Sequence, residues 1–221
     1  MKIKTLFANK KSCEIAGFFI LFWGVCVFNI KSFLFEYIKI KMQVNFMKQK
    51  INLWQLMGFA VTSLLGTILH FLYDWLNGAY LIAPFSGVNE STWEHMKLLF
   101  WPMFIFSIVQ SFFFKEREDF WCIKLKGIAL GLVLIPTIFY TYIGIIGRSY
   151  DFINIAIFFV AALASYAYES RVLKSKSQSC KYSKLFLLIL IIIALLFVMF
   201  TFRTPKIGLF MDPVNGSFGI S

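Results

Sequence analysis

The sequence predicts an all-α integral membrane protein with a five-helix transmembrane core and one extra N-terminal helix. The chain of 221 residues is 59% hydrophobic and only 15% charged, whereas soluble domains are roughly 45–50% apolar and about 25% charged. Its mean hydropathy is +0.74. Several apolar segments also have about the 20 residues that a helix needs to cross a hydrocarbon core of about 30 Å.

The first apolar segment, residues 15–35, lies in an N-terminal extension that we place at residues 1–46. Lysines flank the segment on both sides, so charge gives it no orientation. Three interpretations stay open: a sixth span, an interfacial helix, or a translated segment ahead of a start at Met47. A signal peptide is disfavoured because no small-residue cleavage site follows. We expect a helix here.

Five further segments are expected to cross the membrane within a domain at residues 47–221. Lysine and arginine gather before the first segment, between the second and third, and between the fourth and fifth, while residues 77–92 have none. By the positive-inside rule, the basic connections are cytoplasmic. We therefore expect a cell-membrane protein whose core begins inside and whose C-terminal tail lies outside. The segments are 52–76, 93–114, 127–147, 152–173 and 185–202.

The net charge of +11 does not indicate nucleic-acid binding. The lysines flank apolar segments and do not form one basic face with interleaved aromatic residues. The lipid bilayer is the expected partner, and the sequence identifies no protein partner. The four cysteines show no C-x-x-C spacing, so neither a disulfide framework nor a thiolate metal site is predicted.

Small residues predict how two spans pack. Gly127 and Gly131 in the third span, and Ala161 and Ser165 in the fourth, each lie four residues apart and share a helix face. Such pairs let two helix backbones approach closely. Tyr166, Tyr168 and Glu169 near the inner end of the fourth span are expected to be an interfacial anchor set.

The densest polar group of the domain lies between the first two spans. His70 and Asp74 are four residues apart on one helix face, as are Glu90 and Glu94, with His95 adjacent. A short connection makes these helix ends neighbours. Ionisable groups at the edge of a bilayer core are costly and indicate function. Because neutral imidazole and carboxylate oxygen are zinc ligands, we predict a metal site at the outer face formed by His70, Glu90 and His95.

The same group contains residues for chemistry at such a metal. Glu94 or Asp74 is the predicted catalytic base toward a metal-bound water. The spacing differs from zinc signatures such as H-E-x-x-H. The sequence therefore predicts the cofactor only as a divalent metal such as zinc. Four further residues are predicted to bind a ligand at the outer face: Asn89, Lys97, Tyr142 and Asp212.

A structural interpretation of the same residues stays open. Ser91-Thr92-Trp93-Glu94 fits a capping box, with Ser91 as N-cap and Glu94 at the third helical position. In this interpretation, His70 simply hydrogen-bonds Asp74 or a neighbouring helix. The tail after residue 203 is rich in turn residues and aromatic residues and is expected to fold back over the outer surface.

These observations favour a multi-pass membrane protein with an outward-facing polar site that binds a metal or small ligand. One alternative is a metal-assisted hydrolase acting on a lipid or envelope substrate. A second is a transporter or proton-coupled carrier with a relay through His70 and Asp74, although its midplane should then be polar. A third is a structural scaffold. The sequence does not decide whether the protein is an enzyme.

Two motifs carry a family resemblance: Asn89-Glu90-Ser91-x-Trp93-Glu94-His95 and, in the tail, Asp212-Pro213-x-Asn215-Gly216. Over about residues 50–220 the chain resembles a family of small bacterial multi-pass membrane proteins classed as a domain of unknown function. The resemblance implies the membrane fold and brings no established activity. Phe218 stands where the family pattern has tyrosine.

Overall fold

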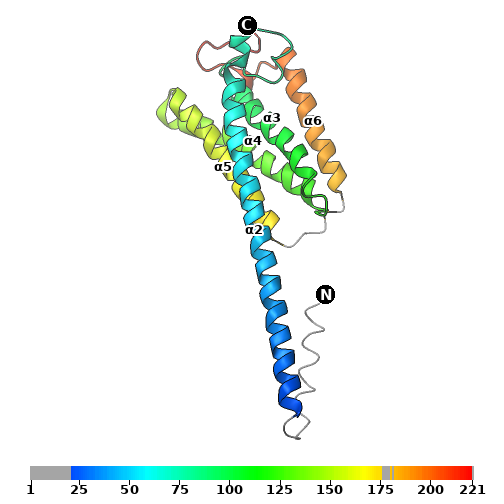
Figure 1. Cartoon of the computed structure of the whole chain (residues 1–221). Helices are drawn as coiled ribbons and strands as arrows, with labels where there is room; N and C mark the ends of the chain where they lie inside the picture. The colour runs from blue at the N-terminus through cyan, green and yellow to red at the C-terminus, as the bar shows by residue number, and fades with distance from the viewer. Residues whose placement is uncertain (1–20, 176–179, 181, 221) are drawn as a thin grey trace. The chain divides into compact units, whose positions relative to one another are not determined.

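The computed structural model of the chain describes residues 21–175, 180 and 182–220. These residues form five α-helices and one 3-10 turn and no β-strand (Figure 1), which confirms the all-helical class. The chain divides into two units, Met1–Gln49 and Lys50–Ser221. The elements are α2 Leu21–Trp75, α3 Thr92–Ser111, α4 Phe120–Ile146, α5 Asp151–Lys174, α6 Ser183–Phe202 and η2 Gly208–Phe210.

Helix α2 differs most from the expected arrangement. Residues 36–51, which we expected to separate an N-terminal helix from the first span, are helical and belong to the same element as residues 52–75. No glycine or proline occurs between Lys31 and Met57, so the residues that most strongly oppose a helix are missing there. Residues 15–20 of the predicted N-terminal helix lie outside the described residues.

Four helices of the described part are long and apolar enough to cross a membrane: Leu34–Trp75 within α2, together with α4, α5 and α6. This agrees with a multi-pass membrane protein. Helix α3 is not among the four, since its first two turns carry Glu94, His95 and Lys97. A membrane span by α3 stays a prediction.

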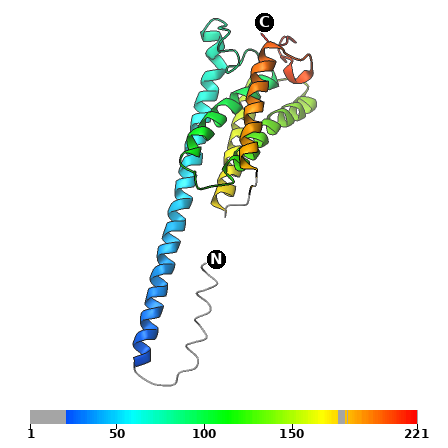
Figure 2. The ribbon, with the colours of Figure 1, turned by 90° about the vertical axis from the view of Figure 1, so that its right-hand side faces the viewer.

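Small residues bring α4 and α5 together, as the sequence predicts, and the two helices lie side by side in both views (Figures 1 and 2). A Cβ atom added to Gly131 would lie 2.6 Å from Ser165 Oγ and 3.6 Å from the Ala161 carbonyl oxygen. A Cβ atom added to Gly127 would lie 2.5 Å from Glu169 Oε1. Helix α5 therefore occupies the space that larger side chains on α4 would need.

The polar stretch of α5 points into the protein, so the predicted interfacial anchor is wrong for Tyr166 and Glu169. Glu169 Oε2 lies 2.5 Å from Lys124 Nζ on α4, and neither side chain is more than 1% exposed. Tyr166 is buried and its hydroxyl lies 2.7 Å from Thr62 Oγ1 on α2. A buried acid is retained here because a buried base faces it, a pairing that sequence position alone does not reveal.

Cys122 at the start of α4 forms a disulfide with Cys180, which precedes α6. This corrects the expectation that the cysteines support no disulfide. The two residues are 58 positions apart and their Cα atoms are 6.8 Å apart. Spacing along the chain is informative for local pairs such as C-x-x-C and carries no signal for this one.

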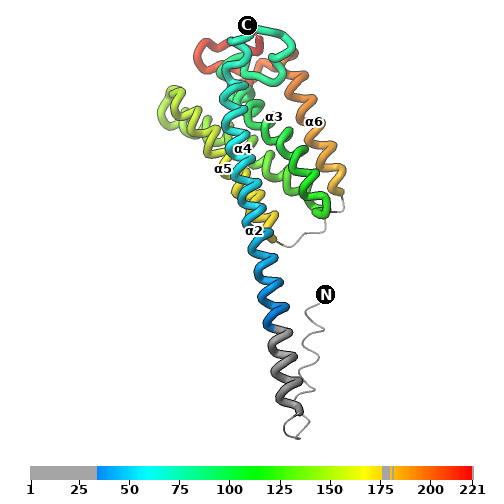
Figure 3. Tube along the Cα trace, viewed as in Figure 1, coloured from blue at the N-terminus to red at the C-terminus, as the bar shows by residue number. Residues whose placement is uncertain are grey.

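The connection 76–91 and the C-terminal tail lie at the same end of the second unit (Figure 3). In the tail, Met211 and Phe218 form an isolated antiparallel bridge. Gly216 closes the turn between them with a φ of +73°, a conformation that favours glycine. Asn89 Nδ2 donates to the Gly219 carbonyl at 3.0 Å. The tail thus folds back onto the connection 76–91, as the sequence predicts.

Candidate metal site at the connection between α2 and α3

Three elements position the candidate site. His70 lies in the penultimate turn of α2, Glu90 in the connection 76–91, and His95 in the first turn of α3. The end of the connection is bonded to α2, since the Gly87 amide donates to the Leu69 carbonyl at 3.2 Å. The Ser86 hydroxyl donates to the same carbonyl. These bonds bring Glu90 beside His70, as the sequence predicts for neighbouring helix ends.

Glu90 lies between the two imidazoles. Its Oε1 is 3.6 Å from His70 Nε2 and its Oε2 is 3.7 Å from His95 Nε2. One donor atom from each residue lies within 4.8 Å of the other two. The side chains are 26%, 42% and 14% exposed for His70, Glu90 and His95, so solvent reaches the cluster. We call these three residues the outer cluster.

The ring of His95 is held in one orientation. Its Nδ1 lies 3.0 Å from the Ser91 carbonyl oxygen, one helical turn earlier. Because a carbonyl only accepts hydrogen bonds, Nδ1 is the donor, and in the neutral ring Nε2 keeps its lone pair. Nε2 is the atom that faces Glu90. A second-sphere carbonyl of this kind is the usual partner of a metal-binding histidine.

The C-terminal tail accepts a hydrogen bond from the backbone of Glu90. The Glu90 amide donates to Asp212 Oδ2 at 3.4 Å, and Asp212 Oδ1 accepts the Val214 amide at 2.8 Å. Asp212 is buried. Asn89 links the same turn to the tail and accepts the Ser91 amide at 2.9 Å. Asp212 and Asn89 are thus brought to the site, where they position its backbone.

Glu94 and Lys97 form a closed pair beside the outer cluster. Ser91 caps α3 and accepts the Glu94 amide at 3.4 Å, which confirms half of the predicted capping box. The Glu94 side chain does not return to the Ser91 amide. Its Oε2 instead accepts the Val88 amide at 3.1 Å and lies 2.5 Å from Lys97 Nζ.

Lys97 is fully buried, and all three of its donors have a partner. Besides Glu94, its Nζ donates to the Ala83 carbonyl at 2.7 Å and to Thr201 Oγ1 at 3.2 Å. The ammonium group therefore ties the connection 76–91 and α6 to α3. Such complete satisfaction is what a buried charge requires, and it gives Lys97 a structural role. Thr201 has no sequence signal that would have identified it.

Asp74 and Tyr142 do not join the outer cluster directly. Asp74 is exposed near the end of α2. The Tyr142 hydroxyl donates to Asn154 Oδ1 at 2.5 Å and lies 3.2 Å from Ser149 Oγ. Tyr142 thereby links α4 to the first turn of α5.

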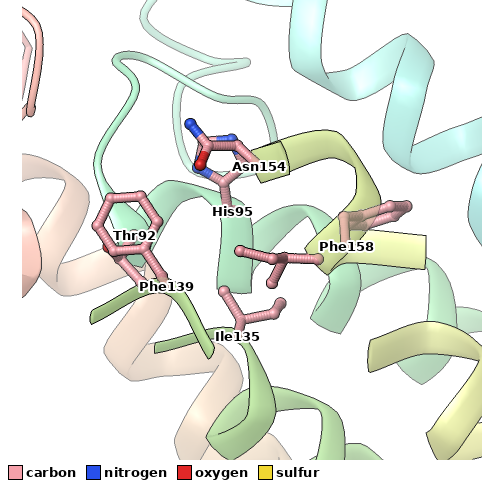
Figure 4. Close-up of a pocket in the computed structure, with 7 residues that line it drawn as sticks. Thr92, His95, Ile135, Phe139, Asn154 and Phe158 are labelled. Atoms are coloured by element: carbon pink, nitrogen blue, oxygen red, sulfur yellow. The ribbon is translucent and has the colours of Figure 1, made fainter. Parts of the chain in front are cut away.

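A small cavity lies against His95 (Figure 4). It has room for about one water molecule. Thr92, His95 and Asn154 supply its polar groups, and four apolar side chains complete the wall. Sequence reasoning missed Asn154, although an amide in the first turn of an otherwise apolar span is a signal that would have found it. The apolar residues are Ile135, Phe139, Ile157 and Phe158.

The outer cluster has the donor chemistry of a zinc site. Two imidazoles and one carboxylate are a ligand set that zinc enzymes use. Zinc–ligand distances of about 2.0–2.2 Å in a tetrahedron put neighbouring donor atoms about 3.4 Å apart. The separations of 3.6 and 3.7 Å each join one Nε2 to a different oxygen of Glu90. One donor atom from each of the three residues fits within 4.8 Å, which is wider than the spacing around a bound zinc ion.

A family model matches residues 42–220, most of the chain. The chain belongs to the family described as "Family of unknown function (DUF6512)". This confirms the resemblance drawn from the two motifs, and the matched region includes the outer cluster and the tail that holds it. No curated protein and no solved structure matches the chain.

Proposed function

We propose that this DUF6512 protein is a multi-pass membrane protein that binds a divalent metal ion, zinc in the first instance, at its outer face. His70, Glu90 and His95 are the proposed ligands. Ser91 and Asp212 are the proposed positioning residues, since they hold the His95 ring and the Glu90 backbone. The proposal extends to five spans, α3 included, with a cytoplasmic start of the core and an external tail, on the basis of the lysine distribution.

The observation that carries the proposal is that the side chains of three potential ligands face one another without hydrogen bonds between their donor atoms. The Glu90 oxygens lie 3.6 and 3.7 Å from the two Nε2 atoms, beyond the 2.7–3.2 Å typical of such hydrogen bonds. Elsewhere the protein joins buried charges at 2.5 Å. An ion bound between these atoms would give each of them a partner, and this supports the proposal.

Elemental mass spectrometry of the detergent-purified protein tests the proposal. We expect near-stoichiometric zinc, or another divalent ion, in the wild type and its loss in His95→Ala. Asp74→Asn is the matched control, because Asp74 is an exposed carboxylate one turn from His70 and outside the outer cluster. Metal-free wild-type protein that stays folded and takes up no added zinc would contradict the proposal.

Metal-assisted hydrolysis is the second candidate function. The observation that favours it is the number of ligands: three protein ligands leave a coordination position open, as in catalytic zinc sites. A bound water at that position would be the nucleophile. The predicted bases have little support, since Glu94 is engaged by Lys97 and Val88 and Asp74 is exposed. The base therefore stays a prediction.

A further inference from the structure

The connection between α2 and α3 is unusually apolar for a segment outside a membrane span. Residues 75–89 contain no lysine, arginine, aspartate or glutamate. Leu81 is 87% exposed and Tyr80 66% exposed. Nearby on α2, Phe71 and Trp75 are also exposed and stack on each other at 5.9 Å. We call these four residues the apolar rim.

The connection folds back along α3. The Ala83 carbonyl accepts from Lys97 Nζ, in the second turn of α3. The Pro84 carbonyl accepts from Trp101 Nε1 at 2.9 Å, one turn further along. Phe85 packs on the Trp101 ring at 4.8 Å. Non-helical backbone is tolerated at membrane depth only where protein groups satisfy it, and buried side chains of α3 do so here.

The part of the apolar rim that lies on α2 adjoins the outer cluster, whereas Tyr80 stacks on Phe202 of α6 at 5.5 Å. Phe71 follows His70 directly and packs against its ring edge-on at 4.7 Å. Exposed aromatic residues at the ends of spans are typical of the layer where lipid headgroups meet the acyl chains. A hydrocarbon chain has apolar partners at the rim, and a headgroup beside it lies next to His70 and Glu90.

We propose that the metal bound by the outer cluster takes a phosphate oxygen of an outer-leaflet phospholipid, whose acyl chain lies on the apolar rim. This inference rests on the proposed metal-binding function. A divalent ion held by two neutral imidazoles and one carboxylate keeps a net charge of +1, so an anionic oxygen is the favoured occupant of its open position. Residues 75–89 contain no lysine or arginine that would compete with the metal for the phosphate group.

Cobalt substitution separates this inference from the function on which it rests. Cobalt(II) prefers ligands similar to those of zinc, and its visible spectrum reports the ligand set. We expect the full chain loaded with cobalt to change its spectrum when a short-chain phosphatidylglycerol is added. Inorganic phosphate and glycerol phosphate, which present the same oxygen without acyl chains, should need at least about tenfold higher concentrations.

Leu81→Asn tests the contribution of the apolar rim. We expect an unchanged cobalt spectrum and a several-fold rise in the lipid concentration that gives half the spectral change. Ile145→Asn is the matched control: Ile145 is 80% exposed at the outer end of α4, and its substitution should leave the lipid response unchanged.

The outcomes are distinguishable. No cobalt spectrum in folded protein would overturn the metal site itself. A cobalt spectrum that does not change when phospholipid is added would overturn only the lipid inference. A spectrum that changes at equal concentrations of lipid and of soluble phosphate would do the same. If Leu81→Asn does not fold, the comparison of lipid with soluble phosphate on the wild type still tests the lipid inference.

Discussion

The outer cluster and the inner pair of Lys124 and Glu169 both place ionisable groups at the ends of membrane-length helices, yet they are constructed differently. The inner pair is closed, with its charged atoms 2.5 Å apart and no more than 1% exposure. In the outer cluster, the donor atoms of Glu90 and the two histidines face one another at 3.6 and 3.7 Å and solvent reaches all three side chains.

Under the proposed function, this difference separates a structural pair of charges from a set of ligands. A closed pair satisfies its own charges and leaves no position for a third group. An open set of donors lacks an internal partner and gains one when an ion binds. Lys97 and Glu94 support the distinction, because they adjoin the outer cluster and are nevertheless closed at 2.5 Å. Proximity to the cluster alone therefore does not identify a ligand.

The largest effect is expected from opening the inner pair. Lys124→Met leaves the Glu169 carboxylate buried without a cation and should lower the free energy of unfolding by about 3–5 kcal/mol. Chemical denaturation in detergent measures this loss. The double variant Lys124→Met/Glu169→Met should recover most of it, and zinc bound per folded molecule should not change. A double variant as unstable as the single one would contradict a purely structural pair.

The affinity of the outer cluster for its metal should depend strongly on pH. Imidazole ligates only when its ring nitrogen is unprotonated, so protons compete with the metal at two ligands. The affinity should therefore fall as pH drops, by more than about tenfold between pH 7.5 and 5.5. Competition with a chromophoric chelator at each pH measures it. A flat profile would mean that the histidines are not ligands.

A smaller stability effect is expected where α4 and α5 touch. Gly127→Ala places a methyl group 2.5 Å from Glu169 Oε1 and should cost about 1–3 kcal/mol in unfolding free energy. Gly144→Ala on the same helix is the control, since no atom lies within 4 Å of its added Cβ. Its exchange should be neutral or slightly stabilising through helix propensity. Equal effects of the two exchanges would contradict close packing at Gly127.

The smallest effect is expected from the tail. Asp212→Asn keeps one acceptor oxygen where both carboxylate oxygens now accept backbone amides. Loosening Glu90 in this way should weaken zinc binding by about tenfold, the lower end of the range for outer-sphere partners. Asn215→Ser, in the exposed turn of the same tail, is the control. Isothermal titration with zinc measures both, and an unchanged Asp212→Asn affinity would remove Asp212 from the positioning residues.

Much of the fold was predictable because membrane helices can be recognised from their length, composition and flanking charge. The expected segments 152–173 and 185–202 correspond closely to α5 and α6. Helix α4 begins seven residues earlier than expected, at Phe120. Lys124 lies in that added part, and a lysine in the first turns of a span looks like an interfacial residue until its partner Glu169 is known.

The outer cluster was predictable for a different reason. His70, Glu90 and His95 flank one short connection, so their proximity follows from chain continuity. Partners distant in sequence were not predictable: Asp212 bonds the Glu90 amide from 122 residues away, and Lys97 bonds Thr201 from 104 residues away. The spacing that suggested Glu94 as a base could not show that Lys97 and Val88 engage it.

X-ray absorption at the zinc edge of the zinc-loaded protein is the most direct test of the outer cluster. We expect a first shell of nitrogen and oxygen atoms at about 2.0–2.2 Å, with outer-shell scattering from two imidazoles in the wild type and from one in His70→Ala. A shell without imidazole, or one containing the sulfur of cysteine, would contradict the assignment of His70, Glu90 and His95 as the metal site.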